Sequence, residues 1–198
     1  MLRVGITGGI GSGKTALTDW LSTQGIVIVD ADLAARVIVE PGQPALAEIA
    51  AQFGQEYLLP DGQLDRAALR KLVFADDAKR QTLESITHPR IRDELTRQMA
   101  AAQSPYVVLS SPLLLESGQS EMVDLSVVVD VPEAVQIERT MARDQNDRAL
   151  VEQIMAAQLD RATRISRADI VIDNSDSLEA LHLRGAQLHR TLLARASA

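Results

Sequence analysis

A glycine-rich segment near the start of the chain has the residue types needed to hold a polyphosphate. Residues 8–15 read GGIGSGKT and match the pattern G-x-x-x-x-G-K-[ST]. The segment follows an apolar run and precedes a stretch of helical character, residues 15–24, which is the strand–loop–helix context that this pattern requires. Glycines let backbone N–H groups close around phosphate oxygens, and the helix N-terminus adds a positive dipole. The segment therefore predicts binding of a nucleoside triphosphate.

The residues of this phosphate-binding loop have distinct expected roles. Lys14 is expected to bridge the β- and γ-phosphates, and the Thr15 hydroxyl to bind Mg²⁺. Guanine recognition through an Asn-Lys-x-Asp loop is excluded because no lysine of the chain follows an asparagine. ATP and Mg²⁺ are thus the expected cofactors. Nucleotide contacts are predicted for Gly9, Gly11, Ser12, Gly13, Lys14 and Thr15.

Two carboxylates directly follow the second apolar run. Asp30 and Asp32 stand at the carboxyl edge of a predicted sheet, where ligands of open α/β folds bind. One residue separates them, so at most one is expected to face the phosphates. Asp32 is favoured as the base that takes a hydroxyl proton, and it could hold Mg²⁺ through water, with Asp30 as a helix cap. The alternative is that both only cap the following helix.

Arginines after the fourth apolar run could neutralise phosphate charge. Arg139 and Arg143 are four residues apart, so they lie on one face of a predicted helix and could clamp ATP as catalytic cations. Arg161 and Arg164, on the next predicted helix, could complete the clamp. The alternative is a solvated helix face on which the arginines pair with neighbouring acids such as Asp144.

Three further positions leave alternatives open. Asp130 ends the fourth run like a Walker B acid, but it comes late in the chain, which makes it a doubtful metal ligand. Glu116 is either an acid on the substrate or Mg²⁺ side or a helix-start residue. His88 and Pro89 are expected to open a helix, and His88, with Arg92 nearby, either faces an anionic substrate or is structural.

The elements that must position these residues alternate along the chain. Short apolar runs separated by helical stretches are typical of parallel βαβ units covered on both faces. The sequence therefore predicts an α/β fold, in which a long helical insertion at residues 43–103 could carry the substrate pocket. The five predicted strands are residues 3–7, 26–29, 106–109, 125–130 and 170–173.

Composition narrows the function classes. The 198 residues, 46% of them hydrophobic, suit one principal domain. A formal charge of −7 and 3% aromatic residues argue against a nucleic-acid surface. The chain has no apolar stretch near the roughly 18 residues of a membrane span, so we expect no membrane association. It has no cysteine, which suits a reducing compartment, so we expect a cytoplasmic location. The expected oligomeric state is a monomer or weak homo-oligomer.

Several of these segments together resemble the dephospho-CoA kinase family, and the resemblance covers nearly the whole chain. The order and spacing agree throughout, although beyond the phosphate-binding loop only the combination is specific. Leu115 stands where the family commonly has Phe, and residues 145–147 replace a stretch that often carries Gly or Ser. The main matching segments are residues 5–15, 30–32, 88–89, 112–116 and 172–174.

The resemblance implies transfer of the ATP γ-phosphate to the ribose 3′-hydroxyl of dephospho-CoA. It implies a P-loop NTPase-type three-layer fold with a nucleotide-binding core (about 1–40, 104–138 and 165–198), a helical substrate-binding subdomain (about 41–103) and a lid (about 139–164). By the same resemblance Asp32 is the base, Arg139 and Arg143 lie in the lid, His88 is near the substrate, and Asn174 is close to adenine. Substrate contacts are predicted for Asp32, His88, Arg92 and Glu116.

Other functions that use the same loop remain to be distinguished. A regulatory nucleotide-binding module would be expected to lack a positioned base and lid arginines. Another small-molecule kinase, for nucleoside monophosphates or shikimate, is the closest alternative, and only the motifs of the insertion discriminate against it.

Overall fold

Five strands form one parallel sheet in the part of the chain that this computed structural model describes, residues 1–145 and 147–197. The strands are β1 (Leu2–Gly8), β2 (Val27–Asp30), β3 (Tyr106–Ser110), β4 (Leu125–Asp130) and β5 (Ile170–Asp173). Their order is β2-β3-β1-β4-β5, so β1 lies in the centre, where Ile6 is opposite Ser110 of β3 and Val127 of β4. The predicted α/β fold with a five-stranded parallel sheet is therefore confirmed, and each predicted strand lies within a residue of its observed bounds.

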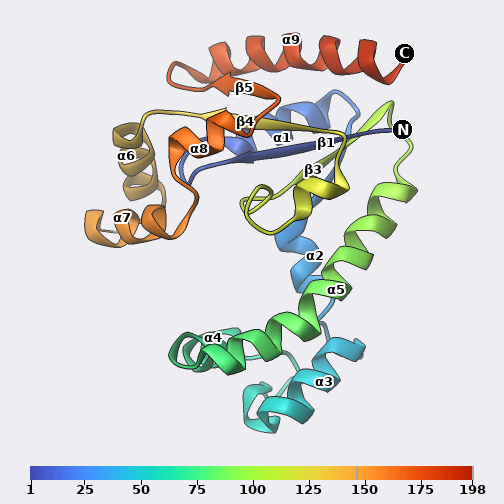
Figure 1. Cartoon of the computed structure of the whole chain (residues 1–198), viewed down its shortest axis with the longest axis vertical. Coiled ribbons are helices and arrows are strands. Elements are labelled where there is room, and N and C mark those ends of the chain that lie inside the picture. The colour runs from blue at the N-terminus through green and yellow to red at the C-terminus, as the bar shows by residue number, and fades with distance from the viewer. Residues whose placement is uncertain (146, 198) are drawn as a thin grey trace. The chain divides into compact units, whose positions relative to one another are not determined.

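The main core lies on the face of the sheet that α1 (Lys14–Thr23) and α9 (Leu178–Ala196) cover (Figure 1). The three central strands, β3, β1 and β4, are buried along most of their length because apolar residues face both sides, whereas the edge strands β2 and β5 are partly exposed. Gly185 lets α9 approach α1, since a Cβ there would lie 3.1 Å from side-chain atoms of Leu17 and Trp20. On the same face the buried Tyr106 hydroxyl lies 2.8 Å from His189 Nδ1, and burial raises the pKa of that phenol. This packing holds α1, and with it the phosphate-binding loop, against the sheet.

Three helices follow β4: α6 (Glu133–Asp144), α7 (Arg148–Ala157) and α8 (Arg161–Ser166). They belong, with the sheet, to a first compact unit formed by residues 1–29 and 99–198. The region 145–147, where the sequence departs from the family that it resembles, includes residue 146, which lies outside the described residues. Gln145 ends α6 in the left-handed conformation (φ 55°), which glycine adopts without strain.

Residues 30–98 form a second compact unit, which is mostly helical as predicted for the insertion. It contains α2 (Ala31–Val37), α3 (Pro44–Phe53), the short helix η1 (Gln55–Tyr57), α4 (Arg66–Ala75) and most of α5 (Asp77–Ala101). Its own apolar cluster includes Val39, Ile49, Leu69 and Ile86. Residues 30–40, which the sequence-based division assigns to the nucleotide-binding core, belong to this unit. Its role in substrate binding stays a prediction.

One local prediction is wrong: His88 and Pro89 do not open a helix, because Pro89 lies inside α5. Proline lacks the N–H that would bond to the carbonyl of Ser85, which costs about 3 kcal/mol in a helix interior. Ser85 and Pro89 are exposed, so water can reach the freed carbonyl, while Ile86 and Leu95 of the same helix are buried. Packing of these buried residues offsets the missing hydrogen bond, and the helix continues.

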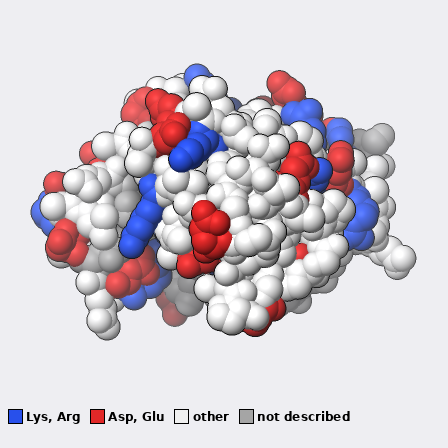
Figure 2. All heavy atoms as spheres, turned by 90° about the horizontal axis from the view of Figure 1, so that it is seen from below, with Lys and Arg blue, Asp and Glu red and all other residues white. Residues whose placement is uncertain are grey.

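No helix in the described ranges has both the length and the apolar composition to cross a membrane. On the face drawn in Figure 2, acidic and basic side chains are interspersed among uncharged ones and do not form one large basic area.

Candidate active site

The phosphate-binding loop connects the carboxyl end of β1 to the N-terminus of α1. Gly11 (φ 71°) and Gly13 (φ 90°) adopt left-handed conformations that turn the chain back into the helix. Gly13 is the N-cap of α1 and no side chain caps the helix, so the first-turn N–H groups have no side-chain acceptor. This geometry leaves a set of backbone donors and a positive helix end for an anion.

Packing also requires glycine in this loop. A Cβ at Gly11 would lie 2.6 Å from the carbonyl oxygen of Gln136 and 2.6 Å from Thr140 Oγ1, both on α6. A Cβ at Gly13 would collide with the side-chain amide of Asn174. The loop is thus held closely between α6 and the segment after β5, which preorganises its N–H groups.

Lys14 and Thr15 are the first two residues of α1, directly after the phosphate-binding loop. Lys14 Nζ donates a hydrogen bond of 2.6 Å to Ser110 Oγ at the end of β3. Thr15 is exposed on the first turn of α1, and the buried Ser12 Oγ has no hydrogen-bond partner within residues 1–145 and 147–197. These polar groups are available to a phosphate or to its metal ion.

Three amide side chains support the loop, and sequence reasoning missed two of them. The buried Asn174 donates through Nδ2 to the Ser12 carbonyl at 2.7 Å. Gln136, buried on α6, donates to the Val131 carbonyl at 3.1 Å, and Gln158 Oε1 accepts from Ile10 N–H at 3.1 Å. Gln136 could have been noticed as a polar residue on the apolar side of α6, whereas nothing local marks Gln158.

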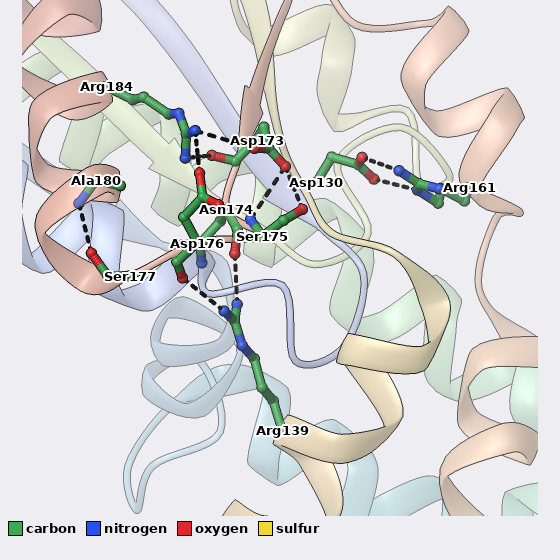
Figure 3. Close-up of polar contacts among 10 residues, drawn as sticks. All are labelled: Asp130, Arg139, Arg161, Asp173, Asn174, Ser175, Asp176, Ser177, Ala180 and Arg184. Carbon is green, nitrogen blue, oxygen red and sulfur yellow. Dashed lines mark hydrogen bonds and ion pairs between the residues drawn. The ribbon is translucent and has the colours of Figure 1, made fainter.

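The two predicted lid arginines have different partners in this structure. Arg139 donates to the carbonyls of Asn174 (2.9 Å) and Asp176 (3.4 Å), in the loop after β5 (Figure 3). Arg143 pairs with the adjacent Asp144, with two hydrogen bonds of 2.6 and 2.7 Å, as the alternative of a solvated pair anticipates. That pairing lowers the pKa of Asp144 and raises that of Arg143. Contacts of either arginine with phosphate stay predictions.

Asp130 forms a bidentate ion pair with Arg161, which joins β4 to α8 (Figure 3). Arg161 Nε and Nη2 donate to the two carboxylate oxygens at 2.9 and 2.7 Å. Both oxygens are therefore used, which fits the doubt about Asp130 as a metal ligand. Arg164 is buried near Gly9 and donates to the carbonyl of Leu159.

Several predicted acceptor-side residues belong to the second unit. Asp30 caps α2 by accepting from the N–H groups of Asp32 (2.9 Å) and Leu33 (3.0 Å), as expected from the sequence. Asp32 is exposed on the first turn of α2. His88 and Arg92 are exposed one turn apart on α5. Glu116, in the first unit, accepts from Leu159 N–H at 3.2 Å.

Comparison with known proteins identifies the family. A dephospho-CoA kinase family model matches residues 2–180. The chain belongs to the dephospho-CoA kinase family. Relatives named dephospho-CoA kinase include one from Idiomarina loihiensis, 47% identical over 96% of this chain and 95% of its own length. Another, from Acinetobacter baylyi, is 47% identical and covers 98% of this chain and 99% of its own length.

A solved structure superposes over nearly the whole chain. The crystal structure of TT1252 from Thermus thermophilus superposes with a TM-score of 0.86 at 32% identity, over 96% of each chain. The family model spans the phosphate-binding loop and the helical second unit alike, and nucleoside monophosphate or shikimate kinases are not favoured.

The donor set fits a magnesium ion that is carried with the nucleotide. The described ranges contain no group of three or more His, Cys, Asp or Glu side chains that could hold a metal by themselves. Mg²⁺ bound with nucleotides takes most of its ligands from phosphates and water and needs few from the protein. In this dephospho-CoA kinase family member the exposed Thr15 hydroxyl beside the loop is suited to that role.

Proposed function

We propose that this protein transfers the γ-phosphoryl group of ATP to the ribose 3′-hydroxyl of dephospho-CoA, giving coenzyme A and ADP. The observation that carries this proposal is the match of one kinase family across both the phosphate-binding loop and the helical second unit, residues 2–180. The preorganised loop supports it, because phosphoryl transfer relies mainly on positioning and charge stabilisation.

The phosphate-binding loop holds the donor. Backbone N–H groups of Gly9 to Thr15 bind the β- and γ-phosphates, and Lys14 exchanges its hydrogen bond with Ser110 for phosphate oxygens. The Thr15 hydroxyl, and Asp32 through a water, would hold a Mg²⁺ ion that comes with the nucleotide, and the ion would neutralise phosphate charge. Asn174, whose side-chain amide adjoins Gly13, lies close to the adenine of the bound nucleotide, as the resemblance to the family implies.

Asp32 acts as the general base. Its carboxylate takes the proton of the 3′-hydroxyl while the hydroxyl oxygen forms a bond to the γ-phosphorus and the bond to the β-phosphate oxygen of ADP breaks. The exposure of Asp32 on the first turn of α2 supports this role, because an incoming hydroxyl can reach it. Asp30 keeps its structural role as the helix cap.

Arginines and acceptor-side residues complete the site. Arg143, with Arg139, offsets charge on the transferring group, which requires Arg143 to exchange Asp144 for phosphate. His88, Arg92 and Glu116 contact the acceptor. We place the reaction in the cytoplasm, in keeping with a chain that has no cysteine, and we propose a monomer or weak homo-oligomer.

A coupled assay with ATP and dephospho-CoA tests the activity, with AMP and shikimate as control acceptors. We expect phosphorylation of dephospho-CoA and at most slow turnover of the other two. An absence of coenzyme A formation by the wild-type chain would refute the proposed function.

Replacement of Asp32 tests the base. Asp32→Asn should lower kcat by about 10²–10⁴-fold, because the hydroxyl proton loses its acceptor. Asp30→Asn is the matched control: it removes the same charge two residues away, and asparagine also caps helices well, so kcat should fall less than about tenfold. Turnover of Asp32→Asn within about threefold of wild type would show that another group is the base.

A further inference from the structure

The second unit contains an apolar cavity of its own. Its volume is about 290 Å³, close to the lower end of the range of small-molecule sites. Its wall is built from aliphatic side chains of α2 to α5 and of the segment after α2, among them Val39, Ile49, Leu69, Val73, Leu83 and Ile91. None of the catalytic roles described above uses this cavity.

Arginines without acidic partners line the same cavity. Arg66 and Arg70 lie one turn apart on α4 and both contribute to its wall. Arg66 Nη2 donates to the carbonyl of Arg36, in the last turn of α2, at 3.4 Å. Within residues 1–145 and 147–197 no ion pair joins any of these three arginines to a carboxylate.

The three guanidinium groups affect one another. Partial burial and the nearby charges of Arg36 and Arg70 lower the pKa of Arg66. Like charges held together in this way are destabilising by themselves, and an anion bound between them would remove the repulsion. The cluster therefore favours a ligand with a phosphate or diphosphate group.

The cluster also has a defined distance from the proposed base. Asp32 and Arg36 are four residues apart on α2, so they share one helix face with a rise of about 6 Å between them. In dephospho-CoA the 3′-hydroxyl and the 5′-diphosphate belong to the same ribose and are separated by a few bonds. An acceptor whose hydroxyl meets Asp32 can thus present its diphosphate to Arg36.

We propose that Arg36, Arg66 and Arg70 bind the diphosphate of the acceptor and that the adjoining cavity takes its pantetheine arm, an assignment that rests on the proposed function. The arm is a chain of aliphatic groups with two amides. Thr87, on the cavity wall, donates its hydroxyl to the Leu83 carbonyl at 2.8 Å, which leaves the oxygen free to accept from an amide N–H. The cavity thus matches both the apolar and the polar parts of the arm.

Charge replacements on α4 test the diphosphate site. Arg66→Gln and Arg70→Gln should each raise the KM for dephospho-CoA by about tenfold or more, because each removes charge-assisted hydrogen bonds to phosphate, while the KM for ATP stays within about twofold. Lys71→Gln is the matched control: it removes one exposed charge from the same helix, outside the cavity wall, and should leave both constants unchanged. Calorimetric titration of the full chain with dephospho-CoA should likewise show weaker binding to Arg66→Gln and Arg70→Gln than to the wild type and to Lys71→Gln.

A truncated acceptor separates the two parts of the site. The β-methyl ester of ADP keeps the ribose and diphosphate but lacks the pantetheine arm. Val73→Trp, which fills the cavity, should raise the KM for dephospho-CoA by about tenfold and leave that for the ester unchanged, whereas Arg70→Gln should raise both. Thr87→Val, which changes shape little, should raise only the KM for dephospho-CoA, and thermal unfolding of each variant verifies folding.

The outcomes distinguish the two proposals. If the wild-type chain does not phosphorylate dephospho-CoA, the proposed function fails. If it does so and the KM for dephospho-CoA is unchanged in Arg66→Gln, Arg70→Gln and Thr87→Val, the function stands and the assignment of the cavity is overturned.

Discussion

Asn174 is a buried amide whose side chain is used by the protein itself. Its Nδ2 donates to the Ser12 carbonyl, and its backbone carbonyl accepts from Arg139 (Figure 3). The side chain therefore connects the loop after β5 to the phosphate-binding loop, next to Gly13. The proposed contact with adenine is compatible with this support, because other atoms of the loop after β5 can contact adenine while the Asn174 side chain stays bonded to the Ser12 carbonyl.

An isosteric change at this residue tests the support. Asn174→Asp replaces the donor with an oxygen that faces the Ser12 carbonyl, so the free energy of unfolding should fall by about 1–3 kcal/mol and the KM for ATP should rise. Urea unfolding and steady-state kinetics measure the two effects. Asp176→Asn, two residues along in the same loop, is the control and should leave the KM for ATP near the wild-type value. Unchanged stability of Asn174→Asp would show that the hydrogen bond contributes little.

The Asp169 side chain helps to hold the segment between α8 and β5 to β4. Asp169 Oδ2 accepts from Ser126 N–H at 2.6 Å and from Ser126 Oγ at 2.8 Å. The backbone hydrogen bond from Ser126, followed by that from the Ser126 hydroxyl, lowers the pKa of Asp169. The interaction fixes where β5 begins beside β4.

This carboxylate makes stability depend on pH in a defined direction. The pKa of Asp169 is lower in the folded state than its unfolded value of about 3.9. The contribution of the carboxylate to the free energy of unfolding is therefore complete above about pH 3.9 and is lost as the pH falls through the folded pKa. Asp169→Asn should lower the free energy of unfolding at pH 7 by no more than about 1 kcal/mol, since the carboxylate is exposed. The difference from wild type should shrink below about pH 4.

Chemical unfolding across this pH range measures the effect. Asp19→Asn, at an exposed position of α1, makes the same change of charge and should give a small difference with no such trend. A difference between wild type and Asp169→Asn that grows on acidification would contradict the assignment.

At the scale of the whole molecule, the residues proposed to bind the two substrates belong largely to different compact units, and Glu116 is the one acceptor-side residue that lies in the first unit. The phosphate-binding loop is part of the first unit, whereas Asp32 and the arginine-lined cavity are part of the second. Each substrate should therefore stabilise the protein without the other, because each has its own set of contacts.

Ligand-dependent stability tests this independence. ATP with Mg²⁺ at about 100 times its Kd should raise the free energy of unfolding of the wild-type chain by about 2.7 kcal/mol. Lys14→Met should lose most of this increase but keep the stabilisation by dephospho-CoA, and Arg70→Gln should show the reverse. Loss of both effects in Lys14→Met would indicate that the two sites do not bind independently.

Much of the fold and the outline of the site could be predicted from sequence because the signals are local. The apolar runs place the five strands within a residue, and the pattern of Gly8 to Thr15 identifies the phosphate-binding loop together with its flanking strand and helix. Asp30 as the cap of α2 is likewise a short-range interaction, between residues two and three positions apart. Pro89 shows the limit of such signals, because burial of other α5 residues such as Ile86 outweighs the effect of a helix-breaking residue.

The sequence by itself determined the class of fold, the phosphate-binding loop and, by resemblance, the family. Only the tertiary structure decided which side chains support that loop and which arginines already have partners. Asn174 and Ser12 are 162 residues apart, and Ile10 and Gln158 are 148 residues apart. Periodicity and backbone preferences act within one helix or strand, whereas these contacts exist only after distant segments pack against each other, so no local pattern can reveal them.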